Sequence, residues 1–215
     1  MGKLVLFDID GTLLKGSFAH EQAFRRAFLK VYGIEAGIDM LDHRGKTDLQ
    51  IVIEVLKLFG LSPGSRQNLY FETLEKEFLI FSQPEKLEVL PGVCALLEKL
   101  KSRNIPLGLL TGNARGIAFS KTEKVDLLSF FDVAASAFGD ESPVRSDLVE
   151  KVRKQGWNPI FLVGDTPRDI EAGKKAKVAT IGVATGIHSV LQLTEAGADL
   201  VLKDLRDPHF IEFIQ

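Results

Sequence analysis

One construction occurs three times in this chain of 215 residues: a short apolar run ends in polar or acidic residues just before a helical pattern begins. The first run, residues 3–14, carries Asp8 and Asp10 followed by a glycine turn. Because the side chains of a strand alternate between its two faces, Asp8 and Asp10 project to the same side. Two carboxylates this close repel each other unless a cation lies between them or one of them keeps a proton. An isolated Asp-x-Asp-Gly fits a solvated turn equally well.

The second run, residues 106–113, places a different chemistry at the end of an expected strand. It finishes with Thr111, Gly112 and Asn113. A hydroxyl next to flexible backbone amides offers the hydrogen-bond donors that a phosphate oxygen needs. Alone, this pattern is weak evidence for a phosphate site.

The third run, residues 160–169, adds acidic residues. Asp165 follows an apolar stretch directly, and Asp169 comes four residues later, near the start of a helix. Carboxylate oxygens of this kind suit Mg²⁺. Because open α/β sheets bind ligands at the carboxyl ends of their strands, we expect the three runs to converge in one crevice.

The order of these motifs resembles that of the haloacid dehalogenase-like hydrolase superfamily. Residues 8–12 match the first motif in full, residues 111–113 the second, and residues 164–169 the fourth. The resemblance implies that Asp8 attacks phosphorus and forms an aspartyl-phosphate. It implies that Asp10 acts first as the general acid and then as the base that activates water.

The resemblance also implies a Mg²⁺ ion held by Asp8, the backbone carbonyl of Asp10, and Asp165. Thr111 would bind the phosphoryl oxygens together with the amides of its two neighbours. Asp169 would act from behind these groups, by orienting a basic side chain or a metal-bound water.

The basic motif departs from the family pattern, which usually has a lysine there. Arg145 is our candidate, since an arginine is always charged and grips phosphate oxygens with two donors. Lys121, Lys124 and Lys151 are nearby alternatives, although each fits a solvated helix face.

A long insertion, residues 15–86, separates the first expected strand from the second. Apolar spacing predicts three helices in it: one that Gly33 ends, one capped by Thr47 that covers residues 49–59, and one over residues 66–81. The insertion resembles the helical cap domain of the phosphoglycolate phosphatase-like branch. Such a cap closes over the active site and selects the substrate. We expect its hinges near residues 14–16 and 83–91, where glycine and proline interrupt the pattern.

Within this cap, Arg44, Gly45 and Lys46 precede the second helix. The two cations suit a carboxylate or a second phosphate on the leaving group, and the glycine lets the backbone come close. An ordinary polar connection explains the segment equally well. His20 and His43 are candidates for a place near the crevice, although a position on the surface is the commoner explanation for each.

Strand and helix patterns alternate from residue 87 to the end, which is typical of a parallel sheet with helices on both faces. We therefore expect an α/β fold: a doubly wound parallel sheet in a Rossmann-like core of residues 1–14 and 87–215, with a small inserted α-helical cap. Loop 184–188 follows another expected strand end and is a candidate to line the site, although an ordinary tight turn that contains His188 is the simpler account. Further strands are predicted at residues 133–137, 179–183 and 200–202.

The composition of the chain limits the classes of molecule that it is expected to bind. A formal net charge of −2 without a basic run argues against nucleic acid, and no apolar stretch reaches the length of a membrane span. We expect a cytoplasmic protein with a small phosphoester as its partner. The single cysteine, Cys94, excludes an internal disulfide and is expected to be buried. The sequence leaves open whether the protein is a monomer or a homodimer.

These observations predict a magnesium-dependent phosphatase of a small phosphorylated metabolite, with phosphoglycolate as the first substrate to try. Family members that displace halide lack a second aspartate like Asp10, so dehalogenation is disfavoured. A phosphosugar mutase uses the same core residues and stays an alternative. A regulatory protein that binds phosphometabolites or accepts a phosphoryl group is the other alternative, although binding alone needs no proton donor such as Asp10.

Overall fold

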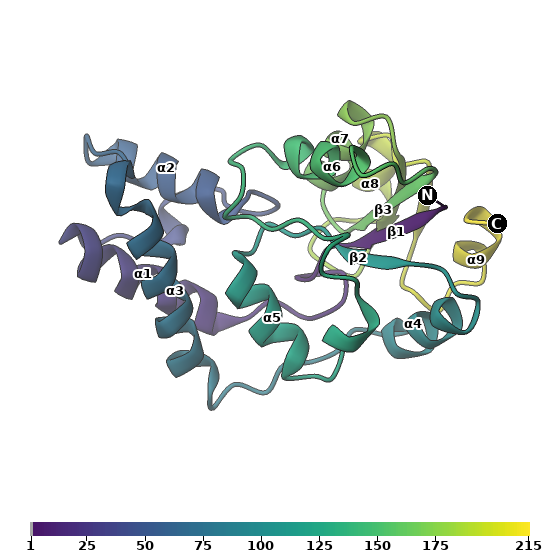
Figure 1. Cartoon of the computed structure of the whole chain (residues 1–215), viewed down its shortest axis with the longest axis horizontal. Coiled ribbons are helices and arrows are strands. Elements are labelled where there is room, and N and C mark those ends of the chain that lie inside the picture. Colours follow the sequence, from purple (N-terminus) through teal and green to yellow (C-terminus); the bar gives the residue numbers. More distant parts are fainter. Residues whose placement is uncertain (1) are drawn as a thin grey trace.

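The computed structural model describes residues 2–215, and within them a single parallel sheet has the strand order β2-β1-β3-β4-β5 (Figure 1). The strands are β1 (Leu4–Phe7), β2 (Leu107–Leu109), β3 (Ile160–Gly164), β4 (Ala179–Val183) and β5 (Leu200–Leu202). β1 lies between β2 and β3, with Val5 opposite both Leu107 and Phe161. β2 lies on one side of β1, and β3, β4 and β5 follow on its other side. The carboxyl ends of β1, β2 and β3 are therefore neighbours at the switch point where such sheets bind ligands.

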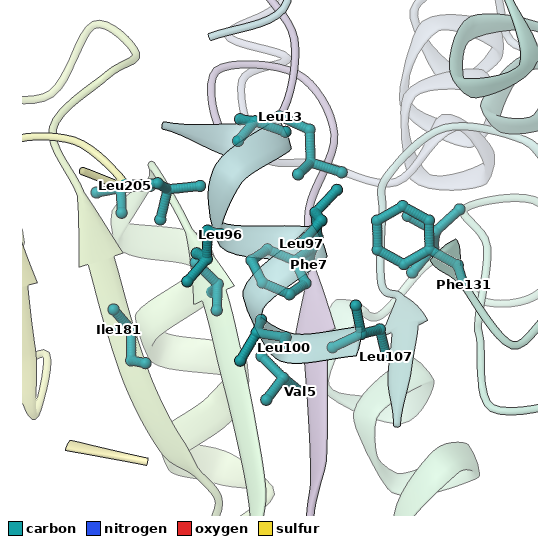
Figure 2. Packing of buried hydrophobic residues seen from close by; sticks show 14 of the residues in the cluster. Val5, Phe7, Leu13, Leu96, Leu97, Leu100, Leu107, Phe131, Ile181 and Leu205 are labelled. Carbon is teal, nitrogen blue, oxygen red and sulfur yellow. The ribbon is translucent and has the colours of Figure 1, made fainter. Parts of the chain in front are cut away.

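One face of the sheet is covered by α4 (Val93–Ser102) and α9 (His209–Phe213). Val5 and Phe7 of β1 point to this face, where the leucine side chains of α4 pack around them (Figure 2). Phe7 also stacks on Phe210, with ring centroids 6.1 Å apart. Burial of both side chains holds the strand that carries the first aspartates.

The opposite face is covered by α6 (Arg145–Arg153) and α7 (Pro167–Lys175), against which Leu4 and Leu6 pack. The core also contains α5 (Arg115–Glu123), α8 (Val190–Glu195) and a 3₁₀ turn at Leu128–Phe130. Because helices cover both faces of a parallel sheet, the predicted doubly wound α/β fold is confirmed.

Three helices form a separate bundle beside the sheet (Figure 1). They are α1 (Phe18–Tyr32), α2 (Asp48–Leu58) and α3 (Gln67–Ser82), with 3₁₀ turns at Ile38–Met40 and Gly64–Arg66. Gly33 ends α1 with a φ of 71°, and the Thr47 side chain accepts the Gln50 amide at the start of α2. The three helices of the insertion are thus where the sequence predicts them.

The bundle has its own apolar interior. Phe24 and Phe28 of α1 pack on Tyr70 of α3, with ring centroids 6.2 and 4.8 Å from the tyrosine ring. The two connections to the core run side by side, since the Lys15 amide donates to the Glu88 carbonyl. We call this bundle the cap, and its division from the core at residues 14 and 87 stays a prediction.

Two expectations are wrong. Residues 133–137 form no strand, because the Ser136 hydroxyl rather than a backbone carbonyl accepts the Leu109 amide, which leaves a single bridge between Leu110 and Ala137. Cys94 is exposed, since it lies on the solvent side of α4. Within residues 2–215, no helix combines the length and the apolarity that a membrane crossing requires.

Candidate active site

A cavity of about 450 Å³ lies between the cap and the carboxyl ends of β1, β2 and β3. It collects the residues singled out in all three apolar runs. The predicted residues that line it are Asp8, Asp10, Arg44, Gly45, Lys46, Thr111, Gly112, Asn113, Arg145 and Asp165. Asp169 lies behind this lining and is fully buried.

Arg145 joins two of the aspartates. This arginine is the first residue of α6, and its side chain is almost completely buried. Its Nη2 lies 3.0 Å from Oδ1 of Asp8 and 2.5 Å from Oδ1 of Asp169. Burial alone would lower the pKa of Arg145, but the charges of Asp169 and Asp8 raise it. The guanidinium is therefore a fixed positive charge beside Asp8. Of the lysine alternatives, Lys151 pairs with Glu141 and Lys124 bonds the Ser82 carbonyl, and neither lines the cavity.

Lys121, the third alternative, is buried against the other aspartate of the first motif. Its Nζ donates to Oδ1 and Oδ2 of Asp10, at 2.9 and 2.6 Å, and to Oδ1 of Asn113 at 2.9 Å. Burial would raise the pKa of Asp10, but the ammonium of Lys121, together with His20 and Asn113, lowers it. The site therefore holds two cations, one on Asp8 and one on Asp10.

The segment after β2 is held tightly. Asn113 donates from Nδ2 to the Thr111 hydroxyl at 2.8 Å and to Asp10 at 2.7 Å. A Cβ on Gly112 would lie 2.2 Å from the Lys46 carbonyl, so only glycine permits this approach of the cap loop. Thr111 is thus linked through Asn113 to the aspartate that the sequence predicts as acid and base.

The cap is docked on this same segment. At the start of α2, the Asp48 amide donates to the Gly112 carbonyl at 2.7 Å, and its carboxylate accepts the Ala114 amide at 2.7 Å. His20 of α1 lies 3.2 Å from the same carboxylate. On α3, Glu75 accepts the Gly116 amide at 2.9 Å. Two cap carboxylates therefore bind the amino-terminal turn of α5, where a helix dipole favours negative charge.

These motifs decide the family. A family model described as haloacid dehalogenase-like hydrolase matches residues 3–177. The chain belongs to this family. It is therefore a hydrolase of the haloacid dehalogenase-like type, as the order of its motifs predicts.

Relatives in this family cover nearly the whole chain. A phosphoglycolate phosphatase of Synechococcus elongatus is 28% identical over 94% of this chain and 93% of its own length. A phosphorylated carbohydrates phosphatase of Thermotoga maritima is 28% identical over 93% of each chain. The crystal structure of a hydrolase from Pseudomonas syringae aligns with a TM-score of 0.73 over 99% of both chains, at 21% identity, and shows the shared fold.

Haloacid dehalogenase-like phosphatases generally use a divalent metal, and the acidic cluster fits one. Oxygens of Asp8, Asp165 and Asp169 lie within 4.8 Å of one another, and the buried Oδ1 of Asp165 has no hydrogen-bond partner within residues 2–215. Burial raises the pKa of Asp8 to about 6 and that of Asp165 to about 8. Buried carboxylates with raised pKa values are stabilised in their charged form by a cation.

Two glycines shape the position of Asp165. A Cβ on Gly11 would lie 2.3 Å from its Oδ2, and a Cβ on Gly186 would lie 1.8 Å from it. Thr185 donates to the Gly11 carbonyl at 2.6 Å, so the loop after β4 is joined to the first motif. The interpretation of loop 184–188 as an ordinary turn is thus incomplete, because Thr185, Gly186 and Ile187 line the cavity.

Other lining residues are only weakly indicated by the sequence. His20 and His43 line the cavity, so a plain surface position is wrong for both. Asp48 is buried at the mouth of the capped helix, and it was seen only as part of a polar connection. Of the cap cations, Lys46 is paired with Glu54 at 2.5 Å, whereas Arg44, more than half exposed, lies 3.7 Å from the carboxylate of Asp42.

Proposed function

We propose that this hydrolase is a magnesium-dependent phosphatase that cleaves a small phosphorylated metabolite through an aspartyl-phosphate on Asp8. The observation that carries the proposal is the convergence of Asp8, Thr111 and Asp165 from three adjacent strands, with Arg145 against Asp8, in a cavity under the cap. A phosphate ester is an anion and repels a carboxylate until its charge is balanced. The site offers both the nucleophile and the balancing charges.

Each residue has a role in the two half-reactions. The Asp8 carboxylate attacks phosphorus, the bond from phosphorus to the leaving oxygen breaks, and Asp10 gives that oxygen a proton. Water then attacks the aspartyl-phosphate, Asp10 takes its proton, and the bond to Asp8 breaks to release inorganic phosphate. A bound phosphate dianion raises the pKa of a neighbouring carboxyl by repulsion, which favours the protonated Asp10 that the first half needs.

The remaining groups bind and orient. Thr111 and the Gly112 amide donate to the phosphoryl oxygens, and Asp169 orients Arg145. The Asn113 amide donates to the Thr111 hydroxyl at 3.2 Å and would have to release it to reach the phosphoryl group. Magnesium would be held by Asp8, the backbone carbonyl of Asp10, and Asp165, and when bound it supplies the positive charge that neutralises phosphoryl oxygens. Burial raises the pKa of Asp8 to about 6, and the positive charge of Arg145 opposes this shift and so favours the carboxylate form that attacks.

Phosphoglycolate is the first substrate to test, because a relative that covers most of the chain is named for it. Arg44 is the cap cation that could turn to the carboxylate of such a leaving group, since its pair with Asp42 is long, at 3.7 Å, and exposed, whereas Lys46 is held by Glu54 at 2.5 Å. We also propose a cytoplasmic location.

The proposal is tested by hydrolysis of 4-nitrophenyl phosphate with and without magnesium. We expect metal-dependent turnover that Asp8→Asn abolishes, while Asp10→Asn retains phosphorylation of the enzyme because a nitrophenolate needs little protonation. Asp126→Asn is the matched control, since this exposed aspartate lies outside the cavity lining and its positive φ of 59° suits asparagine.

The same assay on phosphoglycolate and on sugar phosphates separates the alternatives. Release of inorganic phosphate supports the phosphatase, whereas transfer of the phosphoryl group to a second sugar hydroxyl would identify a mutase. A wild-type protein that binds phosphate esters without any turnover would refute the proposal in favour of a regulatory role.

A further inference from the structure

A buried lysine is the least expected group in the site. Lys121 lies on α5, and only 1% of its surface is exposed, although lysine is almost never fully buried without a partner. Its ammonium lies 5.8 Å from the centre of the Phe78 ring, on α3 of the cap. The cap helix thus covers the charge on one side, and Asp10 and Asn113 bind it on the other.

All three donors of this ammonium are in use. One N–H donates to each oxygen of Asp10 and one to Oδ1 of Asn113, so no N–H remains for a substrate phosphate. Lys121 therefore acts on the reaction through Asp10 and not by touching the phosphoryl group.

The acceptor positions of Asp10 show what this arrangement achieves. An ionised carboxylate offers four acceptor positions, two on each oxygen. Within residues 2–215, Oδ2 receives Lys121 and Asn113, whereas Oδ1 receives Lys121 alone. One acceptor position on Oδ1 is left. The Asp10 side chain is 30% exposed and lines the cavity, so this position is open to a water molecule.

Stabilisation of the fold does not explain the buried ion pair between Lys121 and Asp10. A buried ion pair often contributes nothing more than a well-packed apolar pair, because both charges lose their hydration. Apolar neighbours on α5, Ile117 and Ala118, already anchor the helix. What the ion pair adds is a fixed direction for the carboxylate, because Lys121 and Asn113 together hold both of its oxygens.

We propose that Lys121 is a positioning residue, which holds both oxygens of Asp10 so that one acceptor position faces the water that attacks the aspartyl-phosphate. The inference rests on the proposed function and extends it, since it assigns Lys121 to the hydrolytic half of the reaction. Arg145 serves the nucleophile, and Lys121 serves the acid and base.

The test uses rapid-quench kinetics with 4-nitrophenyl phosphate. Lys121→Met keeps the length of the side chain and removes its charge and donors. We expect a burst of about one nitrophenolate per enzyme at a rate within about threefold of wild type, because this leaving group needs little help. The steady-state rate should fall about 10- to 100-fold, the usual effect of losing a group that orients a reacting one, and the phosphoenzyme should accumulate.

Two controls separate positioning from a structural role. Lys99→Met makes the same change on the exposed face of α4 and should leave both rates unchanged. Lys121→Gln keeps a donor without the charge, and its steady-state rate should lie between those of wild type and Lys121→Met. Magnesium affinity, measured by calorimetry, should stay within about threefold of wild type in every variant, since Lys121 contacts Asp10 only through its side chain.

Equal loss of the burst and the steady-state rate would overturn the inference, because a collapsed site slows both halves. A crystal structure of Lys121→Met tests the inference independently of activity. If the Asp10 carboxyl group keeps its position, Lys121 does not position it; if the carboxyl group is rotated, the inference is supported. If wild type itself formed no phosphoenzyme and released no phosphate, the proposed function would fail, and the crystal structure alone would judge the contact between Lys121 and Asp10.

Discussion

Removing the charge of Arg145 tests whether the aspartates depend on it. Nη2 of Arg145 lies within 3.0 Å of Asp8 and 2.5 Å of Asp169, and all three side chains are almost completely buried. Arg145→Met keeps most of the apolar volume and leaves two buried carboxylates without this cation. In the folded, metal-free protein the two carboxylates therefore lose the cation that stabilises their charges. The unfolded chain loses no comparable interaction, so the free energy of unfolding falls.

The magnitude follows from the burial of the pair. Deleting one partner of a buried ion pair costs about 3–5 kcal/mol, because the remaining charge is left uncompensated. For a chain of this length, each kcal/mol lowers the melting temperature by about 2–4 °C. We expect Arg145→Met to melt about 6–20 °C below wild type near neutral pH in the presence of EDTA.

The assay is thermal unfolding followed by circular dichroism. Arg145→Lys is the matched variant, since it keeps the charge but has one nitrogen where the guanidinium has three, and it should recover part of the loss. The gap between wild type and Arg145→Met should narrow near pH 5, because Asp8, with a pKa of about 6, is then largely protonated in the folded protein. A melting temperature for Arg145→Met within about 2 °C of wild type at neutral pH would refute the reasoning, since that is the change expected for less than about 1 kcal/mol.

Two further predictions concern the metal. Burial raises the folded pKa of Asp8 to about 6 and that of Asp165 to about 8, so the protonated forms stabilise the metal-free fold at low pH, and this contribution is lost as the pH rises through these values. Melting curves in EDTA should therefore shift to lower temperature between about pH 5 and pH 8, and magnesium should raise the melting temperature more at pH 8 than at pH 5; equal shifts would count against these carboxylates as ligands. Gly186→Ala places a Cβ 1.8 Å from Oδ2 of Asp165 and must displace it, so magnesium affinity measured by calorimetry should fall about 10- to 100-fold. Gly2→Ala, where a Cβ meets no atom within 4 Å and which lies outside the cavity lining, should leave the affinity unchanged.

The sheet was predictable because its signals are local. β1 and β3 are short apolar runs that an aspartate follows directly, and their length and apolar composition suffice to recognise them. Residues 133–137 carry the same kind of signal and still form no strand. There the Ser136 side chain replaces a backbone acceptor for Leu109, a substitution that depends on the packed position of β2.

The first-motif aspartates, Thr111 and Asp165 were predictable because a strand end fixes where a side chain points. The contacts of Lys121 with Asp10 and of His20 with Asp48 were not, since each of these residues lies on a helix whose rotation about its own axis is set by packing against distant elements. A lysine with apolar neighbours on a helix usually extends to solvent, and only the arrival of Asp10 from β1 makes burial favourable here. The contact of Asp48 could not be predicted for the same reason, because the backbone amide that it binds, at Ala114, is 66 residues away in the sequence.

The charges around the candidate site relate Arg145, which stands where the family usually has a lysine, to the need for a metal. Four aspartates follow β1 and β3, namely Asp8, Asp10, Asp165 and Asp169, and two cations bind them, Arg145 on the first and last and Lys121 on the second. With all six groups ionised, the aspartates carry −4 and the cations +2. Lys121 offsets Asp10, whereas Arg145 offsets only one of Asp8 and Asp169, so −2 is left over the cluster of Asp8, Asp165 and Asp169. One divalent ion cancels this charge, and a monovalent ion cancels half of it. A phosphate dianion that approaches Asp8 in the metal-free site therefore meets these uncompensated carboxylates, and a divalent cation held by them would remove that repulsion.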